Sequence, residues 1–418
     1  MSSTPPKAAP PYVATHDGIG FKEFIALMAM AMAMNALAID MMLPALPDIG
    51  SALGVTDENG SQLVVTAYLL GFGFAQLFYG PMSDIWGRRR VLIAGIVIYV
   101  AFAGLASFAG SFEQLLFARA MQGVGAAATR VISVSIVRDC YGGRRMASVM
   151  SLIMLVFILV PVIAPALGQI VILLAPWRWV FGLLTLLGAF VLLWAVLRLP
   201  ETLPPERRAA PNVTTIARAY VMALTNRVAL GYTMATTLIL GALFGFINQS
   251  QQVFVGVFDL GTMFPLAFAS IALFMAAASF LNSKIVERLG MRLVSHAALI
   301  GFTLVSLLHV LVIAAGGESV WSFIALQSAT MFMFGLVMSN FNAMAMEPLG
   351  HIAGTASSTL GFATTFGGAL FGFFIGQHFD GTTLPLALGF TLLGAGALAI
   401  VFVTEGGRLF HARNVPAE

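Results

Sequence analysis

Two long apolar segments are joined by the stretch Gly80-Pro81-Met82-Ser83-Asp84-Ile85-Trp86-Gly87-Arg88-Arg89-Arg90. Glycine on each side of the carboxylate permits a tight turn and a close approach of neighbouring helices. The carboxylate of Asp84 can pair with the arginines, or it can lie at the amino end of another helix, where unpaired N–H groups attract negative charge. The stretch therefore predicts a short, charged connection between two helices.

The composition suits a lipid bilayer better than water. Of the 418 residues, 59% are hydrophobic and only 9% are charged, whereas soluble domains carry about 25% charged residues. A spanning helix needs about 20 mostly apolar residues. The hydropathy pattern predicts an all-α membrane protein with twelve transmembrane helices, at roughly 22–44, 61–80, 90–109, 114–136, 147–171, 177–198, 227–252, 263–286, 292–315, 319–344, 352–376 and 383–404.

The longest break between these spans is rich in proline and charge, and it divides the chain into two groups of six. We predict two six-helix bundles related by pseudo-two-fold symmetry, with polar segments around them. The predicted segments are a disordered cytosolic tail at 1–20, the first bundle at 21–198, a cytoplasmic linker at 199–226, the second bundle at 227–405 and a cytosolic tail at 406–418. The first span follows no cleavable signal pattern, so we expect it to be retained.

The basic residues predict the orientation in the membrane. With both termini inside, all but three of the 21 Lys and Arg residues fall in cytoplasmic segments, and the exceptions are Arg119, Arg130 and Arg178. The outer loops instead carry acidic residues, namely Asp48, Asp57, Glu58, Asp259, Glu318 and Asp380. The positive-inside rule then predicts that both termini are cytoplasmic.

A second copy of the charged connection follows the eighth span. It reads Glu287-x-x-Gly290-x-Arg292, and each position lies 203 residues after its counterpart in Asp84-x-x-Gly87-x-Arg89. Duplicated six-helix halves with a solute site between them are typical of secondary transporters. The second copy has Met291 where the first has Arg88, so we expect it to form a weaker latch.

The first copy resembles the Gly-x-x-x-Asp-x-x-Gly-Arg-Arg signature of the major facilitator superfamily. The matching residues are Gly80, Asp84, Gly87, Arg88 and Arg89. The resemblance implies that this loop latches the cytoplasmic gate in the outward-facing state. It also implies that Asp84 meets the start of the eleventh span, close to Gly354, Thr355 and Ser357.

Further motifs resemble the Bcr/CflA group, the bicyclomycin- and chloramphenicol-resistance drug:proton antiporters. They cover nearly the whole chain beyond residue 20. The motifs are Asp40-Met-Met-Leu-Pro44, Tyr79-Gly-Pro81, Arg119-Ala-Met-Gln122-Gly123, Arg138-Asp139, Pro161-Val-Ile-Ala-Pro165, Trp177-Arg178-Trp179, Glu201-Thr-Leu203 and Glu347-Pro348. The resemblance implies proton-driven export across a bacterial inner membrane, and it does not identify the substrate.

Two ionisable residues are candidates for proton coupling. Ionisable groups inside a membrane are costly and usually functional, and a carboxyl group removed from water suits a reversible proton carrier. The resemblance implies such a carboxylate at Asp40 and a coupling arginine at Arg119, which we expect to bias the protonation of Asp40. Alternatively, Asp40 lies at the outer interface, held by water and helix ends, and Arg119 only ties two spans together.

Polar residues within spans are expected to face a cavity or a partner helix rather than lipid. Arg130 lies eleven residues after Arg119, about 16 Å along the helix, and it either snorkels to the interface or faces the cavity and attracts anionic groups. The predicted cavity residues are Asn35, Gln122, Arg130, Asn248, Gln249, Gln251, Gln252, Asn340 and Asn342. Any of the amides could instead bond between helices.

The fifth span contains Pro161, Pro165 and Gly168. The prolines remove backbone donors and should bend the helix, and Gly168 would let another helix approach closely. Similarity to antiporters of the superfamily associates such a span with export. The glycine pattern is incomplete here, so the predicted direction rests more on the Bcr/CflA resemblance.

No enzymatic chemistry is expected. The chain has no phosphate-binding Gly-Lys-Ser loop, its six histidines show no metal-ligand spacing, and its single cysteine excludes an internal disulfide. We therefore expect no cofactor or metal. The Bcr/CflA resemblance implies a transporter driven by the proton gradient, with protons, a small-molecule substrate and the bilayer as partners. We also expect a monomer and no nucleic-acid partner. The alternatives to multidrug export are a transporter of one metabolite or anionic solute, such as an amino acid or siderophore, and a non-transporting receptor or scaffold.

Overall fold

The computed structural model describes residues 18–57, 59–208, 220–222 and 224–410. Most of the predicted tail at 1–20, the central part of the predicted linker at 199–226 and the end of the predicted tail at 406–418 lie outside these ranges. Within them the chain is helical and contains no strand. Twelve helices are long and apolar enough to cross a membrane, which confirms the predicted fold class.

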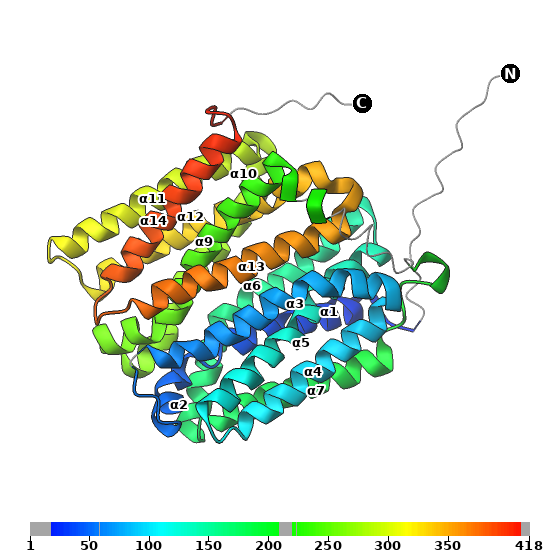
Figure 1. Cartoon of the computed structure of the whole chain (residues 1–418), viewed down its shortest axis with the longest axis horizontal. Helices are drawn as coiled ribbons and strands as arrows, with labels where there is room; N and C mark the ends of the chain where they lie inside the picture. The colour runs from blue at the N-terminus through cyan, green and yellow to red at the C-terminus, as the bar shows by residue number, and fades with distance from the viewer. Residues whose placement is uncertain (1–17, 58, 209–219, 223, 411–418) are drawn as a thin grey trace.

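The helices form two groups that lie side by side (Figure 1). The first group comprises α1 (Phe21–Asp40), α2 (Leu46–Ala52), α3 (Leu63–Trp86), α4 (Arg88–Ser107), α5 (Phe112–Cys140), α6 (Gly143–Leu174) and α7 (Arg178–Arg198). The second comprises α9 (Arg227–Gln251), α10 (Phe264–Leu289), α11 (Met291–Ala314), α12 (Val320–Met346), α13 (Ala353–Gln377) and α14 (Leu384–Thr404). The groups meet where α3 packs on α13 and α6 packs on α10.

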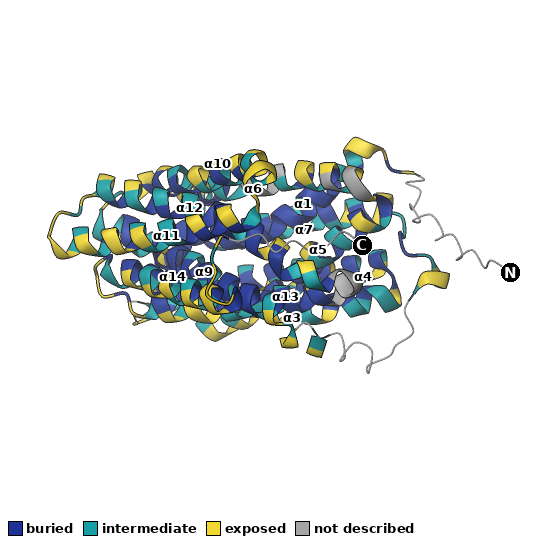
Figure 2. Cartoon of the chain, turned by 90° about the horizontal axis from the view of Figure 1, so that it is seen from above, coloured by how far each residue is buried: buried dark blue, intermediate teal, exposed yellow. Residues whose placement is uncertain are grey.

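Burial follows this arrangement. Figure 2 shows buried residues along the centre of the molecule and exposed ones on its outer faces. Many exposed side chains are large and apolar, among them Phe108, Leu174 and Trp321 at 86%, 82% and 77% exposure. Such residues would be unfavourable in water, so the outer faces are those of a protein surrounded by lipid.

The connection between α3 and α4 is shorter than predicted. Helix α3 continues through the motif to Trp86, with Pro81 inside it, and α4 begins at Arg88. Only Gly87 lies between them, with a φ of 95° that disfavours any residue with a Cβ. The prediction that residues 80–86 form a loop is therefore wrong. Their helical conformation places Asp84 and Arg88 one turn apart, where their side chains can pair.

Helix α6 approaches the end of α1 at Gly168. A Cβ added there would lie 1.8 Å from the carbonyl oxygen of Met41. Pro161 and Pro165 lie within the same helix. The contact at Gly168 brings α6 against the residue that follows Asp40.

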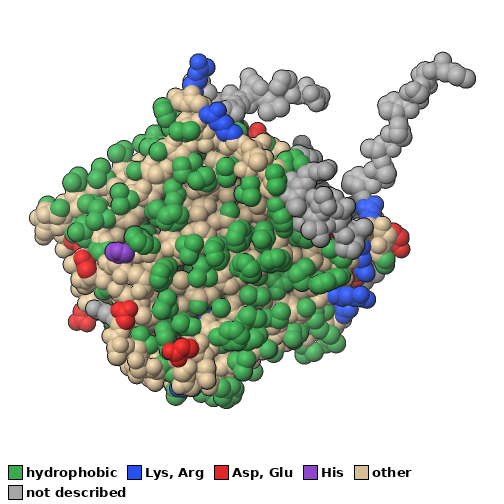
Figure 3. Space-filling model, viewed as in Figure 1, with side chains coloured by type: hydrophobic (Ala, Val, Ile, Leu, Met, Phe, Trp, Pro, Cys, Tyr) green, Lys and Arg blue, Asp and Glu red, His purple; other side chains and the backbone are tan. Residues whose placement is uncertain are grey.

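Charges segregate to the two ends of the bundle, as Figure 3 shows for one face. We call one the basic end. Helix termini there carry Lys22, Arg90, Arg138, Arg198 and Arg288, and Arg408 follows the end of α14. The opposite, acidic end carries Asp48, Asp57, Asp259, Glu318 and Asp380, while Glu58 lies outside the described residues. The ends of α1 and α14 nearest the chain termini both lie at the basic end.

Replacing Gly168 with alanine should destabilise the protein. The added methyl group overlaps the Met41 carbonyl, and overpacking of this kind costs about 1–3 kcal/mol. Gly104→Ala in α4 is the matched control, because its Cβ would meet nothing closer than 3.8 Å. We expect the apparent melting temperature in detergent to fall for Gly168→Ala and to hold or rise for Gly104→Ala. Equal or higher stability of Gly168→Ala would contradict the close contact between α1 and α6.

Candidate functional site

Asp40 is the last residue of α1. The chain then turns through a short 3-10 helix, η1 (Leu43–Ala45), into α2, and α6 packs against α1 and η1. Asp40 is only 4% exposed, and its carboxyl group forms no hydrogen bond or ion pair with the described part of the chain. The carboxyl end of a helix also disfavours negative charge. The structure thus places a carboxyl group where its ionised form is poorly stabilised.

Arg119 lies in α5 and is completely buried. Its guanidinium donates to the backbone oxygens of Val64 (3.1 Å) and Ala38 (3.0 Å) and to Oε1 of Gln122 (2.6 Å). The ring of Tyr68 lies 4.4 Å from its Cζ, in cation–π geometry. These partners are all neutral, so the arginine holds its charge without a carboxylate among the described residues.

Asp40 and Arg119 are therefore close in the fold without forming an ion pair. They are connected through the last turn of α1, since the Ala38 carbonyl that accepts from Arg119 lies two residues before Asp40. A cation at the carboxyl end of a helix stabilises that end. A shift of α5 relative to α1 would change this contact and with it the surroundings of Asp40.

Two predicted cavity residues belong to the same buried network. Asn35 accepts a hydrogen bond of 2.8 Å from the hydroxyl of Tyr68, whose ring lies against Arg119. Gln122 is fully buried and accepts from Arg119. The network links α1, α3 and α5 inside the first group of helices.

The amides near the end of α9 mostly bond between helices. At the acidic end, side chains of the first group bond to the second group across the interface. Asn248 donates to Thr66 (3.4 Å), Gln252 donates to Asn59 (2.9 Å), and Gln62 donates to Gln252. Asn59 also donates to the backbone oxygen of Gln377 at 3.2 Å. We call these six residues the acidic-end latch, because they hold the two groups together at that end.

Three further predicted cavity residues lie within the second group. Gln249 donates to the backbone oxygen of Ile375 on α13 (2.8 Å). Asn340 on α12 donates to Asn282 on α10 (2.8 Å). Gln251 is half-buried. The first two stabilise the packing of neighbouring helices.

A cavity of about 250 Å³ lies between the two groups, from the middle of the interface towards the basic end. It contains the predicted residues Arg130 and Asn342, both of which are exposed to it. Its wall is formed by α3, α5, α12 and α13 through Gln76, Gly80, Asp84, Arg130, Val131, Val134, Ser135, Arg138, Asn342, Met346, Ser357, Leu360, Gly361 and Thr364. This cavity thus touches both halves at the end opposite the latch.

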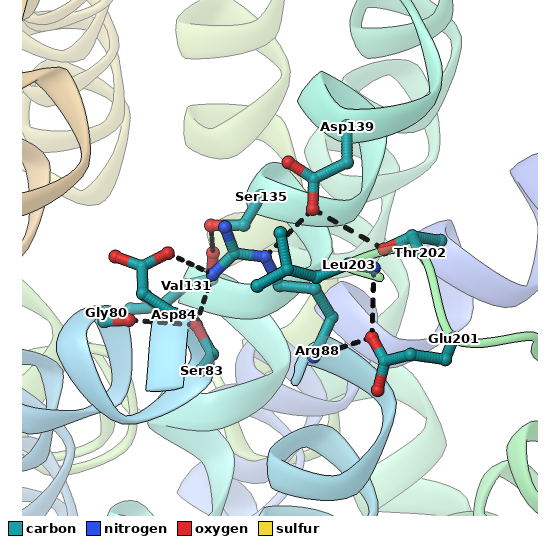
Figure 4. Close-up of polar contacts among 10 residues, drawn as sticks. All are labelled: Gly80, Ser83, Asp84, Arg88, Val131, Ser135, Asp139, Glu201, Thr202 and Leu203. Atoms are coloured by element: carbon teal, nitrogen blue, oxygen red, sulfur yellow. Dashed lines mark hydrogen bonds and ion pairs between the residues drawn. The ribbon is translucent and has the colours of Figure 1, made fainter. Parts of the chain in front are cut away.

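The first motif forms a charged cluster around Arg88, which is 4% exposed (Figure 4). Its guanidinium contacts Asp84 at 2.5 Å and Asp139, near the end of α5, at 2.8 Å. Its backbone N–H donates to Glu201, which follows α7, at 2.9 Å. Glu201 therefore places a carboxylate at the amino end of α4, where the helix dipole favours it. Arg89 donates to the backbone oxygen of Val196 on α7 (2.6 Å).

The second motif forms a comparable cluster with the arginine displaced by one position. Gly290 has a φ of 81°, and Arg292 rather than the residue at position 291 makes the ion pairs. Arg292 contacts Glu405 at the end of α14 (3.0 Å) and Glu347 after α12 (3.6 Å). Glu287 is exposed and forms no ion pair within the described ranges.

Asp84 contacts Arg88 in its own motif and also lines the cavity. Ser357 of α13 lines the same cavity, whereas the surroundings of Gly354 and Thr355 lie outside what the structure describes. Among the described residues, no hydrogen bond or ion pair joins Asp84 to α13. Part of the expected contact site on the eleventh span lies outside the described residues, so the latch between Asp84 and that span stays a prediction.

Several polar residues of these sites were not among the predicted site residues. Asp139, Glu201, Glu347 and Glu405 complete the charged clusters, and Asn59 and Gln62 complete the latch. Arg138 could have been found from helical spacing, because it lies eight residues after Arg130 and so shares its helix face. Tyr232 and His296 extend the second cluster, with the tyrosine hydroxyl 2.7 Å from Glu405 and 3.0 Å from the imidazole.

Known proteins resemble the chain over most of its length. The sequence profile of the Major Facilitator Superfamily matches residues 28–372. A bicyclomycin resistance protein homolog from Haemophilus influenzae is 28% identical over 384 residues, 91% of this chain and 94% of the relative. The multidrug resistance protein MdtL from Klebsiella pneumoniae is 32% identical over 341 residues, 79% of this chain and 83% of the relative.

Solved structures match in fold. A partially occluded inward open conformation of the xylose transporter XylE from E. coli superimposes with a TM-score of 0.70 at 11% identity, covering 94% of this chain and 99% of that one. The human organic anion transporter MFSD10 gives a TM-score of 0.63 at 20% identity, covering 91% and 98%.

Removing Arg88 should destabilise the first cluster. Arg88→Ala leaves Asp84 and Asp139 facing one another without a cation, and loss of one partner of a buried ion pair costs about 3–5 kcal/mol. Water reaches Asp84, which is 35% exposed, so we expect an effect below that range. The melting temperature in detergent should fall for Arg88→Ala and change little for Arg90→Ala, whose side chain is exposed. Identical melting of the two variants would show that the cluster does not stabilise the fold.

Proposed function

Because the chain belongs to the Major Facilitator Superfamily, and is a multi-pass membrane transporter, we propose that it exports small amphipathic compounds in exchange for protons. Relatives named for bicyclomycin and multidrug resistance support this substrate class. The proposed location is a bacterial inner membrane, with a monomer whose basic end faces the cytoplasm, as the positive-inside rule favours.

The buried carboxyl group of Asp40 is the observation that carries the proposal. A carboxylate inside a membrane is costly unless it is paired or solvated, and Asp40 has neither a charged partner nor a hydrogen bond among the described residues. Binding a proton removes the charge and hence the cost. A carboxyl group of this kind is suited to switch, in its neutral form, from access to the water on one side of the membrane to access on the other.

The acidic-end latch and the cavity support the proposed path of the substrate. The acidic end is closed by hydrogen bonds between the halves, while the cavity reaches towards the basic end. In the proposed cycle, substrate enters this cavity from the cytoplasm, and the latch then breaks as the acidic end opens. Asp40 takes up a proton from outside after the substrate has left. Arg119 stays charged throughout and relays movement of α5 to the end of α1.

Asp40→Asn should abolish export while preserving the fold. The amide is nearly the same shape but cannot exchange a proton in the physiological range. In an efflux-deficient bacterial host challenged with a panel that includes bicyclomycin and chloramphenicol, we expect the wild type to raise resistance at least fourfold to some compounds. Asp40→Asn should lose this gain at equal membrane expression. Asp48→Asn, at an exposed position of the acidic end, should retain it.

Retained resistance in Asp40→Asn would contradict proton coupling through Asp40. Protection by the wild type against no compound would contradict drug export. In that case, flux assays in vesicles with an imposed pH gradient separate transport of a single metabolite from a protein that transports nothing.

Crosslinking the acidic end should stop transport. In a Cys140→Ala background, which has no other cysteine, Thr66→Cys and Asn248→Cys together place two thiols where a hydrogen bond now joins the halves. A short bifunctional thiol reagent should abolish export of a transported drug by the double variant, and a cleavable reagent should allow recovery on reduction. Each single variant should be unaffected. Undiminished export by crosslinked protein would mean that the acidic end need not open.

A further inference from the structure

One wall of the cavity carries two arginines. Helix α5 presents Arg130, Val134 and Arg138 at intervals of four residues, so they lie along one face of the helix. Both arginines are exposed, although they lie in the interface between the two groups of helices. Neither forms a hydrogen bond or ion pair with the described residues.

Three other arginines inside the bundle do have hydrogen-bond or ion-pair partners. Arg88 and Arg292 each contact two carboxylates, and Arg119 has three hydrogen-bond acceptors. The carboxylate that lines the cavity belongs to Asp84, and it is already engaged by Arg88 at 2.5 Å. The cavity therefore has an excess of positive charge that the described side chains do not neutralise.

The facing wall is neutral. Helices α12 and α13 contribute the polar groups of Asn342 and Thr364 and the apolar side chains of Met346 and Leu360. Val131 and Val134 add apolar surface beside the arginines. A ligand that complements both walls has an acid group at one end and an apolar body at the other.

We propose that the cavity binds compact amphipathic organic anions, with the acid group on Arg130 and with Arg138 attracting it at the basic end. A guanidinium binds a carboxylate through two parallel hydrogen bonds, and low-dielectric walls strengthen the attraction. The volume of about 250 Å³ lies just below the usual range of about 300–1,000 Å³ for ligand pockets, which favours a ligand of one or two rings. This inference rests on the proposed transport function and specifies its substrate class.

The test compares two ligands that differ only in charge. Binding of 2-naphthoate and of the neutral 2-naphthamide is measured on the full-length protein in nanodiscs of phosphatidylcholine, a lipid whose headgroup carries no net charge to compete for the site. We expect the wild type to bind the carboxylate at least tenfold more tightly than the amide. Arg130→Gln should reduce this preference to about threefold or less, and Arg130→Lys should restore part of it. Arg90→Gln, outside the cavity, should behave as the wild type.

Three results would overturn the inference: equal binding of the two ligands, an undiminished preference in Arg130→Gln, or no binding of either ligand at millimolar concentration. A failure of the proposed export function would appear in flux measurements and not in the binding measurements. Asp40→Asn should keep the preference for the carboxylate, because Asp40 does not line the cavity. A charge preference without any proton-driven flux would reject the exporter and leave the anion site standing.

Discussion

The hydrogen bond from Arg119 to the backbone oxygen of Ala38 is the contact on which the proposed mechanism most depends. A guanidinium buried in a membrane protein must find acceptors, and this one finds them on three helices of the first half. It stabilises the end of α1, and the chain turns away one residue beyond Asp40. The buried cation is therefore satisfied by neutral groups, while the nearby carboxyl group is left without a partner among the described residues. In the proposed mechanism, separating the two charges in this way leaves Asp40 free to exchange a proton.

At the basic end, each half has an arginine held by carboxylates, and the residues differ between the halves. In each, a glycine with positive φ joins two helices, and an arginine after it is held by carboxylates at or just beyond the ends of other spans. In the first half Arg88 contacts Asp139, and in the second Arg292 contacts Glu405. These clusters brace each bundle internally, and in the proposed mechanism the halves move as units about the interface formed by α3 and α13.

Hydropathy and charge were sufficient to predict the twelve spans, because each span must satisfy its own backbone hydrogen bonds and length requirement in lipid. The helix boundaries at the motif were not predictable, since Gly80 and Pro81 usually indicate a loop, whereas α3 continues through both to Trp86. The hydrogen-bond partners of the amides could not be predicted from the sequence either. Sequence gives the depth of Asn248 in the membrane but not its partner across the interface. Arg130 showed the same ambiguity, which only the position of the cavity resolves in favour of an inward-facing side chain.

Alternating access is tested most directly by measuring both ends of the interface at once. Spin labels on cysteines at 51 and 382 report the acidic end, and labels at 90 and 288 report the basic end. All four positions are exposed, and a Cys140→Ala background removes the native thiol. The distances between labels, measured by double electron–electron resonance, should change in opposite directions when pH is varied, so that the acidic end opens as the basic end closes. Asp40→Asn should suppress these pH-dependent changes in distance. Distances that stay constant, or that change together at both ends, would contradict the mechanism.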